Sequence, residues 1–119
     1  MSDMQIQANY QEAVDEFVRR AREKYEDKID SIILFGSVAR GEAGRESDID
    51  ILVVIVGDRF RMRRKLSEIV LDILLETGEY ISVKTLSIEN FKFLKDLKSS
   101  FLSNVIREGI FIERGGVVT

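Results

Sequence analysis

The sequence contains no cysteine and no histidine among its 119 residues. Without cysteine, the chain can form neither a disulfide nor a thiolate metal site. Without histidine, any catalytic base or metal ligand must be a carboxylate, a lysine, a hydroxyl group or water. Carboxylates are therefore the side chains in which catalytic or metal-binding chemistry is expected.

Long apolar runs are also missing, since no stretch reaches the roughly 18–20 residues that span a bilayer. The first residues, Met1 to Gln5, have neither the basic nor the apolar region of a signal peptide. Together with the lack of cysteine, these absences predict a cytoplasmic protein with no membrane association. The net charge of −3 argues against broad nucleic-acid binding, which needs a basic surface. We therefore expect no stable nucleic-acid partner.

Apolar periodicity predicts alternating helices and strands in a single domain over residues 1–119. The predicted helices cover residues 8–26, 38–41, 60–77, 88–97 and 100–107. The predicted strands cover residues 29–35, 48–56, 80–86 and 110–112, and residues 115–119 are expected to be a frayed tail. This order indicates an α/β (α+β) fold, a two-layer sandwich with a small mixed sheet. Its helices are expected on one face and a polar site on the other.

Two aspartates, Asp48 and Asp50, stand two residues apart at the start of the predicted second strand. Side chains alternate between the faces of a strand, so both carboxylates point the same way, with Cα atoms ~6.6 Å apart. Two carboxylates at this spacing can close on one hard cation. Mg²⁺ suits them, because it completes its coordination with water and phosphate oxygens. The pattern predicts a catalytic metal site at Asp48 and Asp50.

Gly36 and Ser37 follow the first predicted strand directly. Glycine permits a positive φ and a close approach of the backbone to a ligand. Ser37 begins a short predicted helix, whose free N–H groups and positive dipole end attract phosphate. A phosphate-binding turn beside paired carboxylates is suited to phosphoryl or nucleotidyl transfer. The alternative is an ordinary turn next to a strand whose aspartates merely face solvent.

The residues Gly36-Ser37-Val38-Ala39-Arg40-Gly41 and Ser47-Asp48-Ile49-Asp50 form the pattern Gly-Ser-x10-Asp-x-Asp. This pattern resembles the signature of the DNA polymerase β-like nucleotidyltransferase superfamily, most of all its minimal nucleotidyltransferase branch. The resemblance covers roughly residues 10–90 and implies Mg²⁺ as cofactor and ATP as the nucleotide. It implies Asp48 and Asp50 as catalytic metal ligands, and a nucleotide-binding set of Gly36, Ser37, Arg40 and Ser47.

Members of the minimal branch are commonly paired with HEPN-domain RNases in prokaryotic toxin–antitoxin systems, and some adenylylate a tyrosine of the toxin. The resemblance therefore implies transfer of AMP from ATP to a hydroxyl group of a HEPN-domain partner. A second hypothesis is a nucleotide-binding module that neutralises its partner by contact alone. A polymerase-like or drug-modifying enzyme is disfavoured by the short chain. The sequence leaves a homo-oligomer open.

Relatives of this kind carry a third metal carboxylate near the start of the following strand. The matching position here is Ser82, whose neutral hydroxyl is a poor substitute for a carboxylate on a divalent ion. Glu79 lies three residues earlier and would face the other way along a strand. The resemblance therefore predicts retained nucleotide binding, whereas activation of the incoming nucleophile is left open.

The predicted helix over residues 60–77 raises two further questions. Five basic residues between Arg59 and Lys65 could steer a nucleotide or RNA towards the site, or could be a solvated helix start. Leu71 and Leu75 widen the apolar face of the same helix. They could lie under neighbouring core elements or in a subunit or partner interface, and the sequence alone does not separate these interpretations.

Overall fold

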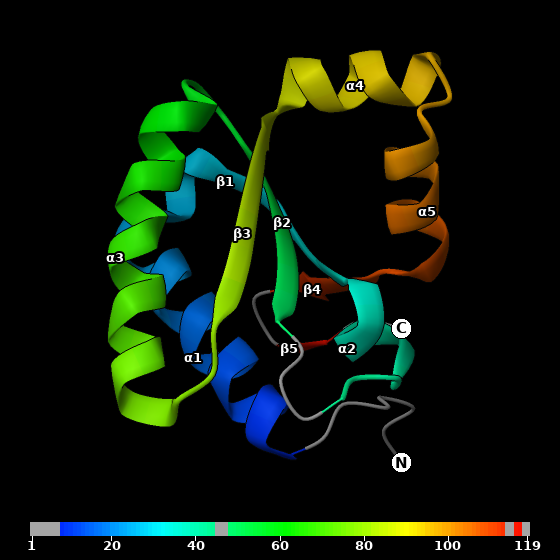
Figure 1. The fold of residues 1–119 in the computed structure, drawn as a ribbon. Helices are drawn as coiled ribbons and strands as arrows, with labels where there is room; N and C mark the ends of the chain where they lie inside the picture. The colour runs from blue at the N-terminus through cyan, green and yellow to red at the C-terminus, as the bar shows by residue number, and fades with distance from the viewer. Residues whose placement is uncertain (1–7, 45–47, 114–115, 118–119) are drawn as a thin grey trace.

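A computed structural model describes residues 8–44, 48–113 and 116–117 of the chain. A five-stranded sheet runs through the centre, with helices on both of its sides (Figure 1). The helices are α1 (Ala8–Tyr25), the 3-10 helix η1 (Glu26–Lys28), α2 (Gly36–Arg40), α3 (Arg59–Thr77), α4 (Ile88–Asp96) and α5 (Ser100–Glu108). The strands are β1 (Ile29–Phe35), β2 (Ile49–Ile55), β3 (Ile81–Ser87), β4 (Ile110–Glu113) and β5 (Gly116–Val117).

The strand order β3-β2-β1-β4-β5 mixes parallel and antiparallel pairs, which confirms the predicted mixed sheet. β2 and β3 are parallel and are connected through α3, whereas β1 pairs antiparallel with both β2 and β4. The prediction of a frayed tail is wrong for Gly116 and Val117. These two residues pair with Glu113 and Ile112 of β4, so backbone hydrogen bonding to that strand orders them. The rest of the predicted tail lies outside the described residues.

The first core cluster lies between the sheet and the two long helices, α1 and α3. The helical stripes predicted from three- and four-residue steps are buried here, among them Phe17 of α1 and Leu66 of α3, each at 0% exposure. They meet β-strand side chains such as Ile51, which is likewise fully buried. Burying a large apolar side chain contributes about 1.5–3 kcal/mol. This layer is therefore the main source of stability for the sheet that carries the aspartates.

The expectation of helices on one face only is wrong, because α4 and α5 pack on the opposite face. A second core cluster joins Leu102 and Val105 of α5 to Ile33 of β1 and Leu52 of β2. The physical reason is that the central strands carry apolar side chains on both faces, and both faces must exclude water. The second layer leaves the start of β2 uncovered: Leu52 is buried, whereas Asp50 is half-buried and Asp48 is exposed.

Helix termini explain how α3 begins with so many basic residues. The Asp58 carboxylate caps the helix, accepting hydrogen bonds from the backbone N–H groups of Phe60 at 2.9 Å and Arg61 at 3.2 Å. Its negative charge offsets the basic residues at the positive end of the helix dipole. Ser87 caps α4 by accepting a hydrogen bond from the N–H of Asn90 at 3.0 Å. Across the described ranges, no helix has the length and apolar character needed to cross a membrane.

Candidate functional site

Asp50 is the second residue of β2, on the face opposite α1 and α3. Its neighbours Ile49 and Ile51 belong to the first core, whereas Leu52, on the same face as Asp50, belongs to the second. Burial is the main cause that raises the pKa of Asp50 above its ordinary value, and the nearby negative charge of Asp48 raises it further. The predicted pair of carboxylates is therefore close enough to interact at the open end of β2.

Gly36 lies directly against the Asp50 side chain. The last residue of β1, Phe35, pairs with Asp50 across the antiparallel β1–β2 ladder, and Gly36 follows with a φ of +78°. A Cβ atom at Gly36 would meet the carboxylate, lying 3.2 Å from its Cγ and closer still to Oδ2. The glycine is thus required both by its backbone conformation and by the carboxylate packed against it. This contact brings the predicted turn and the predicted metal ligand into one site.

Ser37 stands beside Gly36 in α2, a short helix held by its own backbone bonds and by two buried residues. The N–H of Glu42 donates to the carbonyl of Ser37 at 2.9 Å, and Gly41 ends the helix with a φ of +74°. Val38 and Ala39 anchor the helix in the core. These contacts fix the position of Ser37 next to the Gly36–Asp50 contact.

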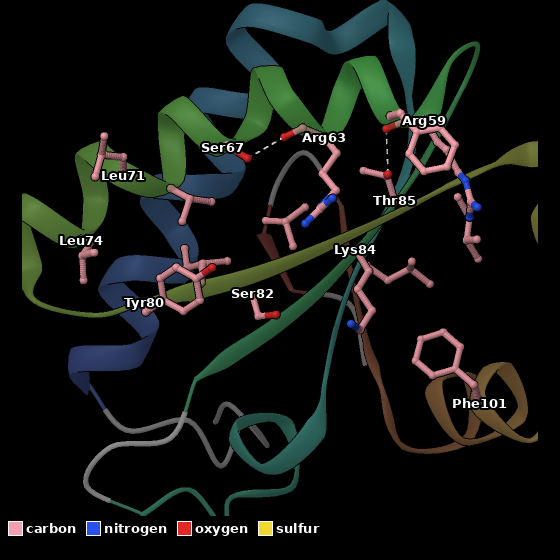
Figure 2. A pocket seen from close by; sticks show the side chains of 16 residues that line it. Arg59, Arg63, Ser67, Leu71, Leu74, Tyr80, Ser82, Lys84, Thr85 and Phe101 are labelled. Atoms are coloured by element: carbon pink, nitrogen blue, oxygen red, sulfur yellow. Dashed lines mark hydrogen bonds between the residues drawn. The ribbon is translucent and has the colours of Figure 1, made fainter.

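Ser82 lies beside Asp50, which is the position that the resemblance to the superfamily predicted for it. The parallel β2–β3 ladder pairs Asp50 with Ser82 and Leu52 with Lys84. Side chains of directly paired residues in neighbouring strands share a face, so the Ser82 hydroxyl belongs to the aspartate side of the sheet. Figure 2 shows Ser82 and Lys84 projecting to the same side of β3. Glu79 precedes the strand, where its N–H donates to the Thr77 hydroxyl at 3.1 Å.

The donor atoms at this site are two carboxylates with a neighbouring hydroxyl. No group of three aspartate, glutamate, histidine or cysteine side chains in the described part of the chain could hold a metal by itself. Mg²⁺ is commonly held by one or two carboxylates and by the phosphate oxygens of a substrate. The donor set around Asp48 and Asp50 therefore fits a magnesium–nucleotide complex better than a metal caged by protein alone.

Arg40 and Ser47 are the remaining two residues of the predicted nucleotide-binding set. Arg40 is exposed, and its guanidinium forms ion pairs with Glu42 at 3.0 Å and Glu108 at 3.4 Å. Its positive charge still lowers the pKa of Asp50, so it acts on the field at the site. A phosphate would have to compete with those glutamates for its donors. Ser47 lies outside the described residues.

The prediction from sequence missed Lys84 as a residue of the site. Its ammonium group lowers the pKa of Asp50, opposing the effects of burial and of Asp48. The sequence did contain a signal for Lys84. Residues two apart in a strand share a face, so Lys84 lies on the same face of β3 as Ser82. A second omission is Tyr10, whose hydroxyl donates to the carbonyl of Gly44 at 2.7 Å and ties α1 to the loop that leads towards the aspartates.

The fold and this arrangement of turn, strand and carboxylates define a nucleotidyltransferase-type domain. The chain belongs to the nucleotidyltransferase domain family, whose model matches residues 14–110. A protein of Methanocaldococcus jannaschii described as "Putative protein adenylyltransferase" is 42% identical over 102 residues, which cover 85% of this chain and 95% of the relative.

Two solved structures are also similar to this chain. A crystal structure described as "a putative nucleotidyltransferase from Sulfolobus solfataricus" matches with a TM-score of 0.60 and 22% identity, covering 90% of this chain and 84% of that one. A chain from a crystal structure of the toxin–antitoxin MntA-HpeT matches with a TM-score of 0.49 and 19% identity, covering 83% and 71% of the two chains. The first of these likenesses confirms the fold.

Proposed function

We propose that this chain binds ATP with Mg²⁺ and transfers AMP to a hydroxyl group of a partner protein. The observation that carries the proposal is the contact between Gly36 and the Asp50 carboxylate, since it joins the phosphate-binding turn to a metal-binding side chain. A turn with a positive φ at glycine brings backbone N–H groups close to a phosphate. The neighbouring pair of carboxylates supplies the ligands that a magnesium–nucleotide complex needs.

Each residue of the site has a role in this proposal. Asp48 and Asp50 hold Mg²⁺, which when bound neutralises phosphate charge and orients the triphosphate. Gly36 and Ser37 contact the phosphates through their backbone and the Ser37 hydroxyl. The ammonium of Lys84, exposed on the same face, adds positive charge beside them. These groups position the α-phosphate without any side chain that must form a covalent intermediate.

In the transfer, the acceptor oxygen forms a bond to the α-phosphorus, and the bond from that phosphorus to the leaving pyrophosphate breaks. The acceptor proton passes to a carboxylate oxygen of Asp50. Carboxylates are the bases available for this proton, because the chain contains no histidine. Ser82 adjoins the acceptor side, where its hydroxyl can orient the incoming group but cannot take up a proton as a carboxylate would.

We propose a HEPN-domain protein as the partner, in a prokaryotic toxin–antitoxin pair. The support is the spacing from Gly36-Ser37 to Asp48 and Asp50, which resembles the minimal nucleotidyltransferase branch. The name of the similar M. jannaschii protein, a protein adenylyltransferase, supports a protein hydroxyl as acceptor rather than a small molecule. The chain would then silence its partner by adding AMP to it.

A second candidate function is control of the partner by contact alone. Two observations favour it: a hydroxyl, rather than a third carboxylate, adjoins Asp50, and Arg40 is paired with Glu42 and Glu108. In this case the chain would bind nucleotide and the partner without transferring AMP. Both candidates share the nucleotide site and differ only in the chemical step.

The deciding experiment incubates the chain with Mg²⁺, ATP labelled on its α-phosphate, and a HEPN-domain protein as the proposed partner. Transfer predicts label on the partner, which is lost in the double variant Asp48→Asn with Asp50→Asn. Contact alone predicts no label, although the unmodified partner still loses RNase activity when the chain is added. Label transfer that persists in the double variant would contradict the assigned site.

A further inference from the structure

Strand β3 forms one edge of the sheet, with β2 on its inner side. The N–H of Ile49 donates to the carbonyl of Tyr80 at 3.0 Å, which sets the alternation of the backbone groups along β3. In a parallel ladder alternate residues face the neighbouring strand, so Ser82 and Lys84 direct their backbone groups towards β2. Ile81, Val83 and Thr85 therefore direct theirs outwards, where no strand of the described ranges pairs with them. Ile81 and Thr85 are buried there, at 0% and 7% exposure, whereas Val83 is half-buried and can be reached from outside.

A groove of about 470 Å³ follows this outer edge, between α3 on one side and Lys84 and Phe101 on the other (Figure 2). Exposed apolar side chains line it: Leu71 is 54% exposed, Tyr80 48% and Phe101 40%. Leu71 is thus not covered by core elements, which excludes the first interpretation of its place on the helix. Apolar side chains on both sides of an unpaired strand edge are the features that accept an added strand.

The groove is basic, although the whole chain carries a net charge of −3. Arg59 and Arg63 of α3 and Lys84 of β3 line it, and no acidic residue appears among its described lining residues. The Arg59 guanidinium stacks 4.6 Å from the centre of the Phe60 ring. The Thr85 hydroxyl donates to the Arg59 carbonyl at 2.8 Å and holds the start of α3 against β3. These positive charges are therefore positioned along the strand edge rather than spread over the surface.

We propose that this groove binds an extended, acidic segment of the partner protein as an additional strand on β3. Backbone hydrogen bonds to Val83 would hold the segment, and its acidic side chains would meet Arg59 and Arg63. A second copy of this chain is a poorer occupant. Pairing two β3 edges would bring two sets of the same positive charges together, which costs free energy.

This inference rests on the proposed function for its purpose, since Ser82 both lines the groove and pairs with Asp50. A segment that runs along β3 passes directly beside the site. A hydroxyl-bearing residue of that segment would then be carried to the nucleotide by the strand pairing itself. The groove thus selects the acceptor by its extended backbone and its negative charge.

The binding test uses a fluorescein-labelled peptide in which glutamate and valine alternate around one tyrosine, without nucleotide or Mg²⁺. Fluorescence anisotropy should show binding of this peptide and none of its counterpart with lysine in place of glutamate. Arg63→Glu should weaken binding by roughly tenfold or more. Arg64→Glu is the matched control, because it makes the same charge change one residue away on α3 but does not line the groove. Equal losses in both variants would overturn the proposal.

The strand pairing has its own test in the exchange of backbone amide hydrogens. Bound acidic peptide should slow exchange at the outward-facing amide of Val83 in the unmodified chain. Val83→Pro removes one outward N–H without removing a bond to β2, and should reduce binding, whereas Val83→Thr should retain it. If peptide binds without protecting the Val83 amide, the segment does not add to the sheet and the proposal fails.

Other occupants give distinguishable results. Binding of labelled polyuridine in place of the acidic peptide, lost in Arg63→Glu, would make the groove a nucleic-acid site and overturn the proposal. A dimer in sedimentation that dissociates in Val83→Pro would assign the edge to a second copy. If the peptide binds but its tyrosine receives no labelled AMP, the proposed function fails while the docking site stands. If the tyrosine is labelled to the same extent with the Arg63→Glu variant, the docking proposal fails while the proposed function stands.

Discussion

Gly36 begins α2 and Asp50 lies in β2, yet the backbone of the glycine packs against the carboxylate of the aspartate. A Cβ at position 36 would lie 3.3 Å from the Asp50 Cβ and still nearer its carboxylate. Phe35, which pairs with Asp50, brings the two residues together at the end of β1. The consequence is that the glycine turn and the Asp50 side chain cannot move independently.

Replacing Gly36 with alanine tests this contact. The φ of +78° strains any other residue by about 1–2 kcal/mol, and the new methyl group must also displace the Asp50 carboxylate. Gly78→Ala is the matched control, because its φ is +80° and nothing lies within 4 Å of the added Cβ. Urea denaturation should show a greater loss for Gly36→Ala, and calorimetry should show weakened Mg·ATP binding for that variant alone. Equal effects of the two variants would contradict the contact.

The register of β2 and β3 predicts what an added carboxylate at position 82 would do. Ser82→Asp places a third negative charge beside Asp50 and Asp48, so the metal-free protein should melt at a lower temperature near neutral pH. Added Mg²⁺ should recover the loss by binding the folded state. Ser82→Asn controls for size without charge. If Mg²⁺ stabilises the aspartate variant no more than the asparagine variant, position 82 does not face the metal.

The stability of the metal-free protein should depend on the titration of Asp50. Its pKa is raised in the folded state, chiefly by burial, so its stabilising effect is fully present below the unfolded-chain pKa of about 4. That contribution is lost as the pH rises through the higher folded-state pKa. Asp50→Asn should therefore stabilise the protein at neutral pH, and the difference from the unmodified chain should vanish below about pH 4. Chemical denaturation across this pH range, without divalent cations, measures the difference in stability between the two proteins. A difference that grows towards acid pH would contradict a raised pKa for Asp50.

The start of α3 depends on Asp58, and two substitutions separate its hydrogen bonds from its charge. Asp58→Ala removes both and should cost about 1–2 kcal/mol, because the N–H groups of Phe60 and Arg61 lose their acceptor. Asp58→Asn keeps an oxygen acceptor and loses only the charge next to a run of basic residues. It should cost less, by an amount that shrinks in high salt. Thermal unfolding at two salt concentrations measures both effects, and a salt-independent cost for the asparagine variant would exclude the electrostatic part.

The elements of this protein could be predicted from sequence because their signals are local. Apolar periodicity predicted a helix over residues 8–26 and a strand over residues 29–35, and the structure has α1 and β1 there. The pattern from Gly36-Ser37 to Asp48 and Asp50 also indicated the family, because all of its residues lie within one short stretch of sequence. Periodicity reports which side of an element is apolar, and that is sufficient to place helices and strands.

Only the tertiary structure decided which elements cover each other. Leu52 shows on sequence that its face of β2 is apolar, but not that α5 covers it, and Leu71 shows an apolar helix face that nothing covers. The resemblance to the superfamily already placed Ser82 beside the aspartates, whereas the position of Lys84 and the outer edge of β3 depend on strand register and strand order. Register is set by contacts between segments far apart in the chain, whose energies compete globally, so no local pattern of residues contains it.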